Sequence, residues 1–457
     1  MQRLSGLDAS FLYLETPKQP LHVCSILEVD PATMPGGYSF GQMKDELALR
    51  IRGMPIFREK LVDSPFNLDH PVWVDDDDFD LDRHVHRIGL PAPGGRRELA
   101  EFCGHIASVP LDRSRPLWET WVIEGLENGR FAVLTKVHHA GVDGVSGANL
   151  MSVLCDTEPD AQPPDPVEGP GGLNQLELAA GGLFRFATRP LHLARVLPLT
   201  LASVLETVRR GVSGEAMTAP FRAPKTPFNA KVSSHRNVAW AQLDLEDIKT
   251  VKNRFNVKLN DVVMALCAGV LRQFLLDRGA LPNDPLVATV PVSVRDKSDR
   301  AGRNQVSGMF SRLETHIEDP AERLRAISKA NSTAKEHSSA IAATLLQDWT
   351  QFAAPAVFGI AMRVYASSRL TDSRPVHNLV ISNVPGPQTP LYFLGAEIRA
   401  MYPLGPIFHG SGLNVTVLSL NGTLNIGLIS CPELLPDLWQ LADGFQSGLD
   451  ELLAAKP

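Results

Sequence analysis

The sequence predicts an α/β protein whose two halves each form a mixed sheet with flanking helices. Three observations support this fold class. Runs typical of strands alternate with runs of helical spacing, the same alternation returns after residue 236, and a segment rich in proline, glycine and acidic residues lies between. The 457 residues suffice for two or three domains of ordinary size.

The first half predicts a domain over residues 1–156. Alternating or β-branched apolar runs indicate its strands, and apolar residues three and four apart indicate its helices. The expected strands are residues 21–29, 84–90, 117–125 and 130–139, and the expected helices are residues 39–54, 95–109 and 145–155.

The second half predicts a domain over residues 236–457. Its clearest local signal is Asn421-Gly422, a dipeptide that favours a two-residue hairpin turn. The expected strands are residues 238–243, 286–294, 377–384, 413–420 and 423–430, and the expected helices are residues 259–277 and 321–346.

Residues 157–235 differ in composition from both halves. Residues 157–172 are rich in proline and glycine and predict an irregular linker, whereas residues 173–211 are apolar and carry five arginines against two glutamates, in a chain whose net charge is −7. A buried linker helix and a helix that docks on an anionic membrane or lipid-droplet surface both fit this second segment. On a helical wheel the basic residues of this segment fall within one arc: Arg185, Arg189, His192 and Arg195. Apolar residues cover much of the remainder: Leu183, Phe184, Leu191, Leu193 and Leu197. Two prolines, Pro190 and Pro198, interrupt the helix.

Composition narrows the class of function. A net charge of −7 offers no basic surface for a phosphate backbone, so we expect no nucleic-acid partner. The five cysteines are scattered and form no CxxC pair, which is typical of reduced, buried thiols. Asp8 and Glu15 interrupt any signal-peptide core, and no run reaches the roughly 18 apolar residues of a spanning helix. We therefore expect a cytoplasmic protein, free or peripheral at the inner membrane or lipid droplets.

The segment HHAGVDG at residues 138–144 is the strongest chemical motif. It follows a strand, and two glycines bracket a turn before a helix-like run. Alternation along the strand puts His138 on the face of Lys136 and His139 on the opposite, apolar face. An imidazole at the end of a strand can project into a cleft.

His139 is suited to remove a proton from an alcohol. A histidine is mostly neutral at cellular pH and acts as a general base without a metal or partner nucleophile, as attack of a hydroxyl on a thioester requires. Asp143 is placed to cap the following helix. The alternative is that Asp143 is only a cap and both histidines are core residues.

Other site chemistries fit poorly. The chain contains no G-x-S-x-G, and Gly144-Val145-Ser146-Gly147-Ala148 fails at its last position. Adjacent histidines on an extended strand cannot both face one metal ion, and no H-E-x-x-H occurs. His84 and His86 share a strand face near the acidic residues 75–78, and a strand preceded by a solvated acidic loop explains this segment better than a metal site does. We expect no metal ion and no cofactor.

Five motifs give the chain a family resemblance. They are PLWE at residues 116–119, HHxxxDG at 138–144, Asn260-Asp261, PVSVR at 291–295 and SNVPGP at 382–387. Together they resemble the bacterial wax ester synthase/diacylglycerol acyltransferase family, in its mycobacterial, triacylglycerol synthase form. HHxxxDG alone also occurs in peptide-synthetase condensation domains. The resemblance runs from Leu4 almost to the C-terminus and is weakest in the linker.

The resemblance implies two domains like those of the CoA-dependent acyltransferases, with both substrates meeting in a tunnel between them. It implies that His139 is the general base and that Asp143 is chiefly structural. Acyl-CoA is then a substrate rather than a cofactor. The expected acceptor is diacylglycerol, which gives triacylglycerol, with long-chain alcohols and wax esters second.

Further motif residues are candidates for substrate binding or for shaping the tunnel. Capping explains Asn260 and Asp261 as well as tunnel shaping does, and a turn requirement competes with oxyanion stabilisation at Ser382 and Asn383. Arg295 is expected to pair with an acid across the domains, with Asp143 as one candidate. The predicted site comprises His138, His139, Asp143, Gly144, Asn260, Asp261, Arg295, Ser382 and Asn383.

Two rival functions remain open. One is a condensation-type acyltransferase that accepts its acyl group from a carrier protein, which activity with free acyl-CoA would exclude. The other is a non-catalytic lipid-droplet binding protein, which thiol release from acyl-CoA would exclude.

Overall fold

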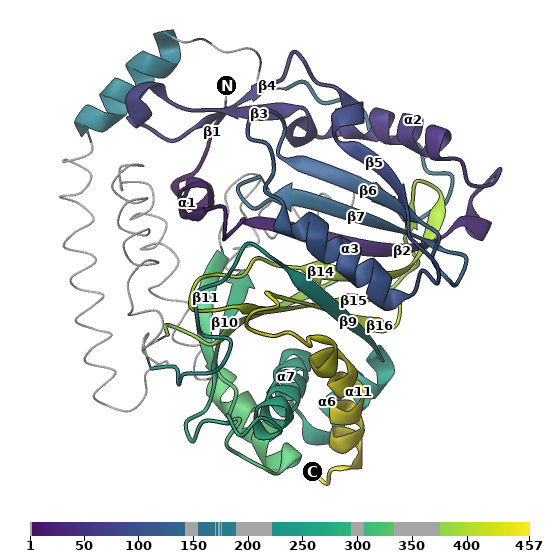
Figure 1. Cartoon of the computed structure of the whole chain (residues 1–457), viewed down its shortest axis with the longest axis vertical. Coiled ribbons are helices and arrows are strands. Elements are labelled where there is room, and N and C mark those ends of the chain that lie inside the picture. The colour runs from purple at the N-terminus through teal and green to yellow at the C-terminus, as the bar shows by residue number, and fades with distance from the viewer. Residues whose placement is uncertain are drawn as a thin grey trace.

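A computed structural model describes residues 2–141, 154–169, 171, 174, 176–188, 222–293, 306–332 and 375–457. Two large sheets lie one above the other, and Figure 1 shows α3 where they meet and α6, α7 and α11 on the far side of the second sheet. The α/β fold class predicted from the sequence is confirmed.

The first sheet has seven strands in the order β5-β6-β7-β2-β14-β13-β8. The same half of the chain contributes helices α2 (Phe40–Arg50) and α3 (Arg96–Ser108). The strands are β2 (His22–Asp30), β5 (Val85–Gly89), β6 (Trp118–Glu124), β7 (Phe131–His138), β8 (Cys155–Asp156), β13 (Tyr392–Phe393) and β14 (Ala396–Leu404).

The second sheet has six strands in the order β11-β10-β12-β15-β16-β9. The β15–β16 hairpin turns at Asn421 and Gly422, both at positive φ, as the predicted turn requires. The strands are β9 (Asn237–Asp244), β10 (Val287–Ser293), β11 (Val306–Arg312), β12 (Leu379–Pro385), β15 (Leu413–Leu420) and β16 (Thr423–Ser430).

A third sheet has three strands, β1 (Gln2–Arg3), β4 (Val72–Asp75) and β3 (Glu59–Val62), in the order β1-β4-β3. The N-terminal helix α1 (Gly6–Leu14) follows β1, with the Ser5 side chain capping its first turn. Three further helices are α6 (Leu245–Phe255), α7 (Leu259–Leu276) and α11 (Trp439–Ala454).

The two halves of the chain share the first sheet. Strand β14 leaves the second half and pairs with β2 from Glu397 opposite Asp30 to Leu404 opposite Cys24. The sheets approach so closely that a Cβ added to Gly427 would lie 2.0 Å from the Pro403 carbonyl oxygen, so the contact requires glycine. The predicted domain limits at residues 156 and 235 stay predictions. They divide the chain by sequence, whereas the first sheet contains strands from before residue 156 and from after residue 235.

Buried Arg236 also ties the halves together. Its main-chain N–H donates to the Ser108 hydroxyl oxygen at the end of α3 (2.8 Å), and its guanidinium donates to the Lys18 carbonyl (3.0 Å). The segment before the second sheet is therefore anchored on the first half of the chain.

Most expected elements occur within two residues of their predicted ends. Helix 145–155 is wrong at its end, because Cys155 belongs to strand β8, which pairs with β13 from the other half of the chain. Residues 145–153 of that helix, and residues 333–346 of the helix expected at 321–346, lie outside the described residues. The expected helix 39–54 ends at Arg50 and continues as a 3-10 turn.

Helix α7 qualifies the expectation about spanning segments. Its 18 residues are long and apolar enough to cross a membrane by composition, but 67% of them are buried inside the protein. They pack in the core beneath the second sheet beside α11. Within the described part of the chain, no other helix reaches that length and hydropathy.

Candidate active site

Strand β7 carries the histidine pair to the edge of the core. All eight of its residues are buried, and it lies between β2 and β6. Lys136 is fully buried, forms an ion pair with Glu119 (2.9 Å), and donates hydrogen bonds to carbonyls of α3 and the residue after it. The charges of Lys136 and His138 both lower the pKa of buried His22, which lies opposite His138 in the sheet.

The His138 ring is fully buried, and one of its nitrogens, Nδ1, is held by a hydrogen bond. Its Nδ1 accepts the main-chain N–H of Ala140 (3.0 Å), so the proton of the neutral ring belongs on Nε2. Nε2 lies 3.4 Å from Glu15 Oε1. That separation exceeds an ordinary hydrogen bond, so the contact is a close electrostatic one in this conformation.

His139 is the first residue after β7 and is less buried than His138. Its main-chain N–H donates to the Leu21 carbonyl (2.9 Å). Its ring stacks on Phe11 of α1, with centroids 3.9 Å apart and planes 16° from parallel. The strand end and the helix together orient the imidazole that the sequence proposes as the base.

A buried ionic cluster supports the pair. Burial raises the pKa of Glu15, but the close contact with His138 and the hydrogen bonds and charge of Arg113 lower it by more, so that it falls to about 2. Burial and the Lys136 charge lower the pKa of His22 to about 3. Glu15 is therefore an anion and His22 is neutral at cellular pH.

The structure brings Asn260 and Asn383 together. Asn383 Nδ2, on β12, donates to Asn260 Oδ1 in the first turn of α7 (3.2 Å). Ser382 is half-buried beside Asn383. The contact links two motifs that lie far apart in the sequence.

Asp261 is used structurally. Its carboxylate accepts the Lys258 main-chain N–H at the start of α7 (3.1 Å), as in a helix cap. It also accepts from the Ser328 hydroxyl and the Asn331 amide, both at 2.9 Å. Of the two alternatives for Asp261, these contacts favour the structural one.

Three predicted site residues lie outside the described residues: Asp143, Gly144 and Arg295. Their roles, and the pairing of Arg295 with Asp143, stay predictions. In contrast, Phe11 and Glu15 contact the histidine pair and Arg113 pairs with Glu15, and none of these three residues was predicted. The available signal was Phe11 and Glu15 at a spacing of four, which puts both on one side of a helix.

The cysteines are all free and buried. Burial raises the pKa of Cys24 and Cys267 to about 12 and raises that of Cys103 and Cys155 as well. A thiol of this kind stays protonated, and a thiolate is the form that attacks an acyl group.

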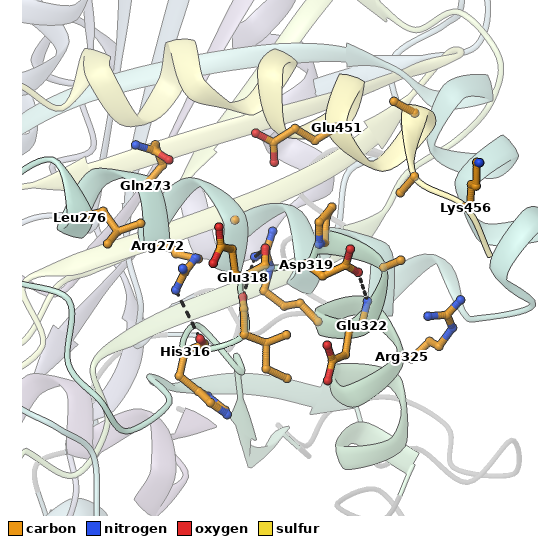
Figure 2. Close-up of a pocket in the computed structure, with 17 residues that line it drawn as sticks. Arg272, Gln273, Leu276, His316, Glu318, Asp319, Glu322, Arg325, Glu451 and Lys456 are labelled. Atoms are coloured by element: carbon orange, nitrogen blue, oxygen red, sulfur yellow. Dashed lines mark hydrogen bonds between the residues drawn. The ribbon is translucent and has the colours of Figure 1, made fainter.

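A large open hollow, about 1410 Å³, lies away from the histidines. Figure 2 shows it between α7, α11 and residues 316–325, with basic and acidic side chains on its walls. Its arginines already bind main-chain carbonyls: Arg272 that of Thr315, and Arg323 that of Ile317. None of the predicted site residues that the structure describes lines it, so we locate the site by the histidine pair and not by this hollow.

Among the described side chains, no three of His, Cys, Asp or Glu gather as metal ligands would. His84 Nδ1 contacts the Trp118 carbonyl oxygen (2.8 Å), and the two rings stack. Packing therefore accounts for His84.

The structure is thus an α/β protein with a histidine pair at the end of a buried strand, and comparison with known proteins supplies its family. The model of the wax ester synthase/diacylglycerol acyltransferase catalytic domain matches residues 4–263, and that of the family's C-terminal domain matches residues 303–453. This chain belongs to the wax ester synthase/diacylglycerol acyltransferase family, and it is an acyltransferase.

Several mycobacterial proteins are similar over nearly their whole length. One from Mycobacterium tuberculosis H37Rv, which carries the name diacylglycerol O-acyltransferase, is 58% identical over 99% of this chain and 90% of its own. Another from that strain, named diacylglycerol O-acyltransferase tgs2, is 36% identical over 97% of both chains.

Solved structures agree with the fold. The wax ester synthase/diacylglycerol acyltransferase from Marinobacter aquaeolei VT8 is 31% identical, with a TM-score of 0.70 over 99% of this chain and 98% of that one. The first condensation domain of the calcium-dependent antibiotic synthetase is 17% identical over 100% and 97%, with a TM-score of 0.58. At that identity the second likeness concerns the fold alone.

The two histidines should respond differently to substitution. We expect His139→Ala to fold normally and to lower turnover by roughly 10²–10⁴-fold, the contribution of a positioned general base. His138→Ala removes a fully buried ring, so we expect it to lower the melting temperature more and turnover less. Thiol release from acyl-CoA and thermal unfolding measure the two effects. Near-full activity of His139→Ala alongside an inactive His138→Ala would reverse the assignment.

Proposed function

We propose that this acyltransferase esterifies diacylglycerol with the acyl group of acyl-CoA, with His139 as the general base. The supporting observation is His139 itself, which stands just beyond a buried strand with its main chain and ring both held. The acceptor follows from the mycobacterial relatives, whose names specify diacylglycerol. Long-chain alcohols, which give wax esters, are the second acceptor class.

The proposed reaction is a direct transfer. His139 takes the hydroxyl proton as the alcohol oxygen attacks the thioester carbonyl carbon. The tetrahedral oxyanion then collapses, the carbon–sulfur bond breaks, and the CoA thiolate leaves with the proton returned from His139. Neither a metal nor a cofactor enters this scheme, because CoA is part of the substrate.

The other motif residues have supporting roles in this scheme. Ser382 and the Asn383 amide are candidate donors to the oxyanion, and the Asn260 contact orients that amide. We further propose that Asp143 is chiefly structural, that Gly144 contributes to substrate binding, and that Arg295 pairs with an acid across the two domains. Asp261 supports Asn260 by fixing the start of α7.

The proposed place of action is a lipid surface bordering the cytoplasm. The helix at residues 176–188 exposes Leu183 (61%) and Phe184 (70%), and it lies beside the β1-β4-β3 sheet, away from α11 (Figure 1). Arg185 on this helix pairs with Asp69, so contact with lipid depends on the apolar side chains more than on this charge. The other basic residues of the segment, Arg189, His192 and Arg195, lie outside the described residues.

Direct transfer predicts no covalent acyl-enzyme. Burial keeps Cys24, Cys103, Cys155 and Cys267 protonated, and direct transfer needs no nucleophilic side chain of the protein. Intact-mass spectrometry after incubation with palmitoyl-CoA alone should show the unmodified chain. A stoichiometric acyl adduct that diolein removes would contradict the mechanism.

Acceptor preference is tested by competition. Palmitoyl-CoA is limiting, and diolein and hexadecanol are present in equimolar amounts. We expect the main product to be a triacylglycerol with two oleoyl chains and one palmitoyl chain, which chromatography identifies. Predominant palmityl palmitate would reverse the order of acceptors. Free palmitate alone would show that water is the acceptor and would overturn the proposal, and activity restricted to carrier-bound acyl groups would favour a condensation-type enzyme.

Surface binding is tested by sedimentation with vesicles of phosphatidylcholine and phosphatidylglycerol. Replacing Leu183 and Phe184 by glutamate should weaken binding by tenfold or more, since burial of each apolar side chain is worth about 1.5–3 kcal/mol. The control is Leu49→Glu, because Leu49 is 42% exposed on α2. Equal sedimentation of all three proteins would remove this surface from the proposal.

A further inference from the structure

The last turn of α1 touches the histidine pair at two points. Phe11 lies against the His139 ring, and Glu15, whose main-chain N–H donates to the Phe11 carbonyl (3.1 Å), faces His138. One helical turn therefore supplies both a wall for the proposed base and an anion beside its neighbour.

Glu15 reaches His139 and the residues on either side of it by two routes. Its Oε1 accepts the Leu21 N–H (3.1 Å), and the Leu21 carbonyl accepts the His139 N–H (2.9 Å). The same oxygen faces His138 Nε2, while His138 Nδ1 accepts the Ala140 N–H (3.0 Å). The carboxylate thus acts on the residue before His139 and, through Leu21, on His139 itself.

Arg113 keeps the carboxylate in place. Its guanidinium donates to Glu15 Oε2 from both Nε (3.1 Å) and Nη2 (2.5 Å) and to the Leu12 carbonyl (3.0 Å). Oε2 is therefore occupied by the cation, and Oε1 is left to Leu21 and His138. Only 9% of the Glu15 side chain is exposed, so water screens these contacts little.

We propose that Glu15 is a positioning residue for His139, acting through His138 and Leu21, an inference that rests on the proposed function of His139 as the base. The carboxylate orients the Nε2–H of His138 and holds the strand of Leu21 in register with the turn at His139. An error of about 1 Å in the position of a catalytic group costs on the order of 10²-fold in rate. The effect should therefore fall on turnover and not on substrate binding.

The variant that tests this is Glu15→Gln, which keeps the size and one acceptor oxygen but removes the charge that Arg113 and His138 share. We expect kcat to fall by about 10–100-fold with KM for palmitoyl-CoA within about twofold. The matched control is Glu28→Gln, because Glu28 on β2 is also mostly buried and also pairs with an arginine, Arg130, but at the opposite end of β7. The control should keep full turnover.

A double-variant cycle separates positioning from general stability. In a His139→Ala background, Glu15→Gln should cause little further loss, because a residue that acts through the base has nothing left to position. An equal loss in both backgrounds, or unchanged kcat in Glu15→Gln alone, would overturn the proposal. Glu15→Asp, which keeps the charge, should recover part of the lost turnover and replaces Glu15→Gln if that variant fails to fold.

A chemical readout distinguishes this inference from the proposed function. Diethyl pyrocarbonate modifies accessible imidazoles, and peptide mass spectrometry reports the rate at His139. Loosening of the turn should raise that rate several-fold in Glu15→Gln and leave Glu28→Gln unchanged. If the unaltered protein transfers no acyl group to any alcohol, the proposed function fails, whereas an unchanged modification rate counts against the positioning role alone.

Discussion

The main-chain hydrogen bonds of β2 join the two halves of the chain and place the site. On one edge β2 pairs with β7, His22 opposite His138, and on the other it pairs with β14 from the second half. If β2 were displaced, the sheet would lose strands from both halves and the histidine pair would lose the support of Leu21. Strand pairing here is therefore also the constraint that orients the proposed base.

The parts of the fold that could be predicted are those with a local signal. Strands β15 and β16 match their predicted limits because Asn421-Gly422 fixes the turn between two apolar runs. Strand β14 gave no such signal: its sequence includes Arg399 and Pro403, and its place depends on β2, more than 350 residues earlier. Short β8 was read as the end of a helix for the same reason, since its partner β13 is distant in sequence.

The site was predictable to the same extent. A strand followed by a histidine pair and a glycine-containing turn indicated the proposed base. The alternation of side chains along the strand predicted different surroundings for His138 and His139. The sequence placed Asn260 and Asn383 in one site but could not predict that they form a hydrogen bond. No local pattern reveals which side chains of α7 and β12 meet. Glu15 was read only as a charge that interrupts a signal peptide, and its distance in sequence from His138 concealed its role.

Glu15 nevertheless breaks a local rule. It follows the last turn of α1, where main-chain carbonyls point outward and the helix dipole disfavours an acid. Burial adds a second penalty to the charged form. Arg113 and the ring of His138 offset both, so tertiary contacts keep a carboxylate where helix preferences and solvation disfavour one. Such a conflict between local preference and tertiary structure is typical of functional positions. It separates Glu15 from Asp261, whose carboxylate at the start of α7 satisfies the capping preference and needs no further explanation.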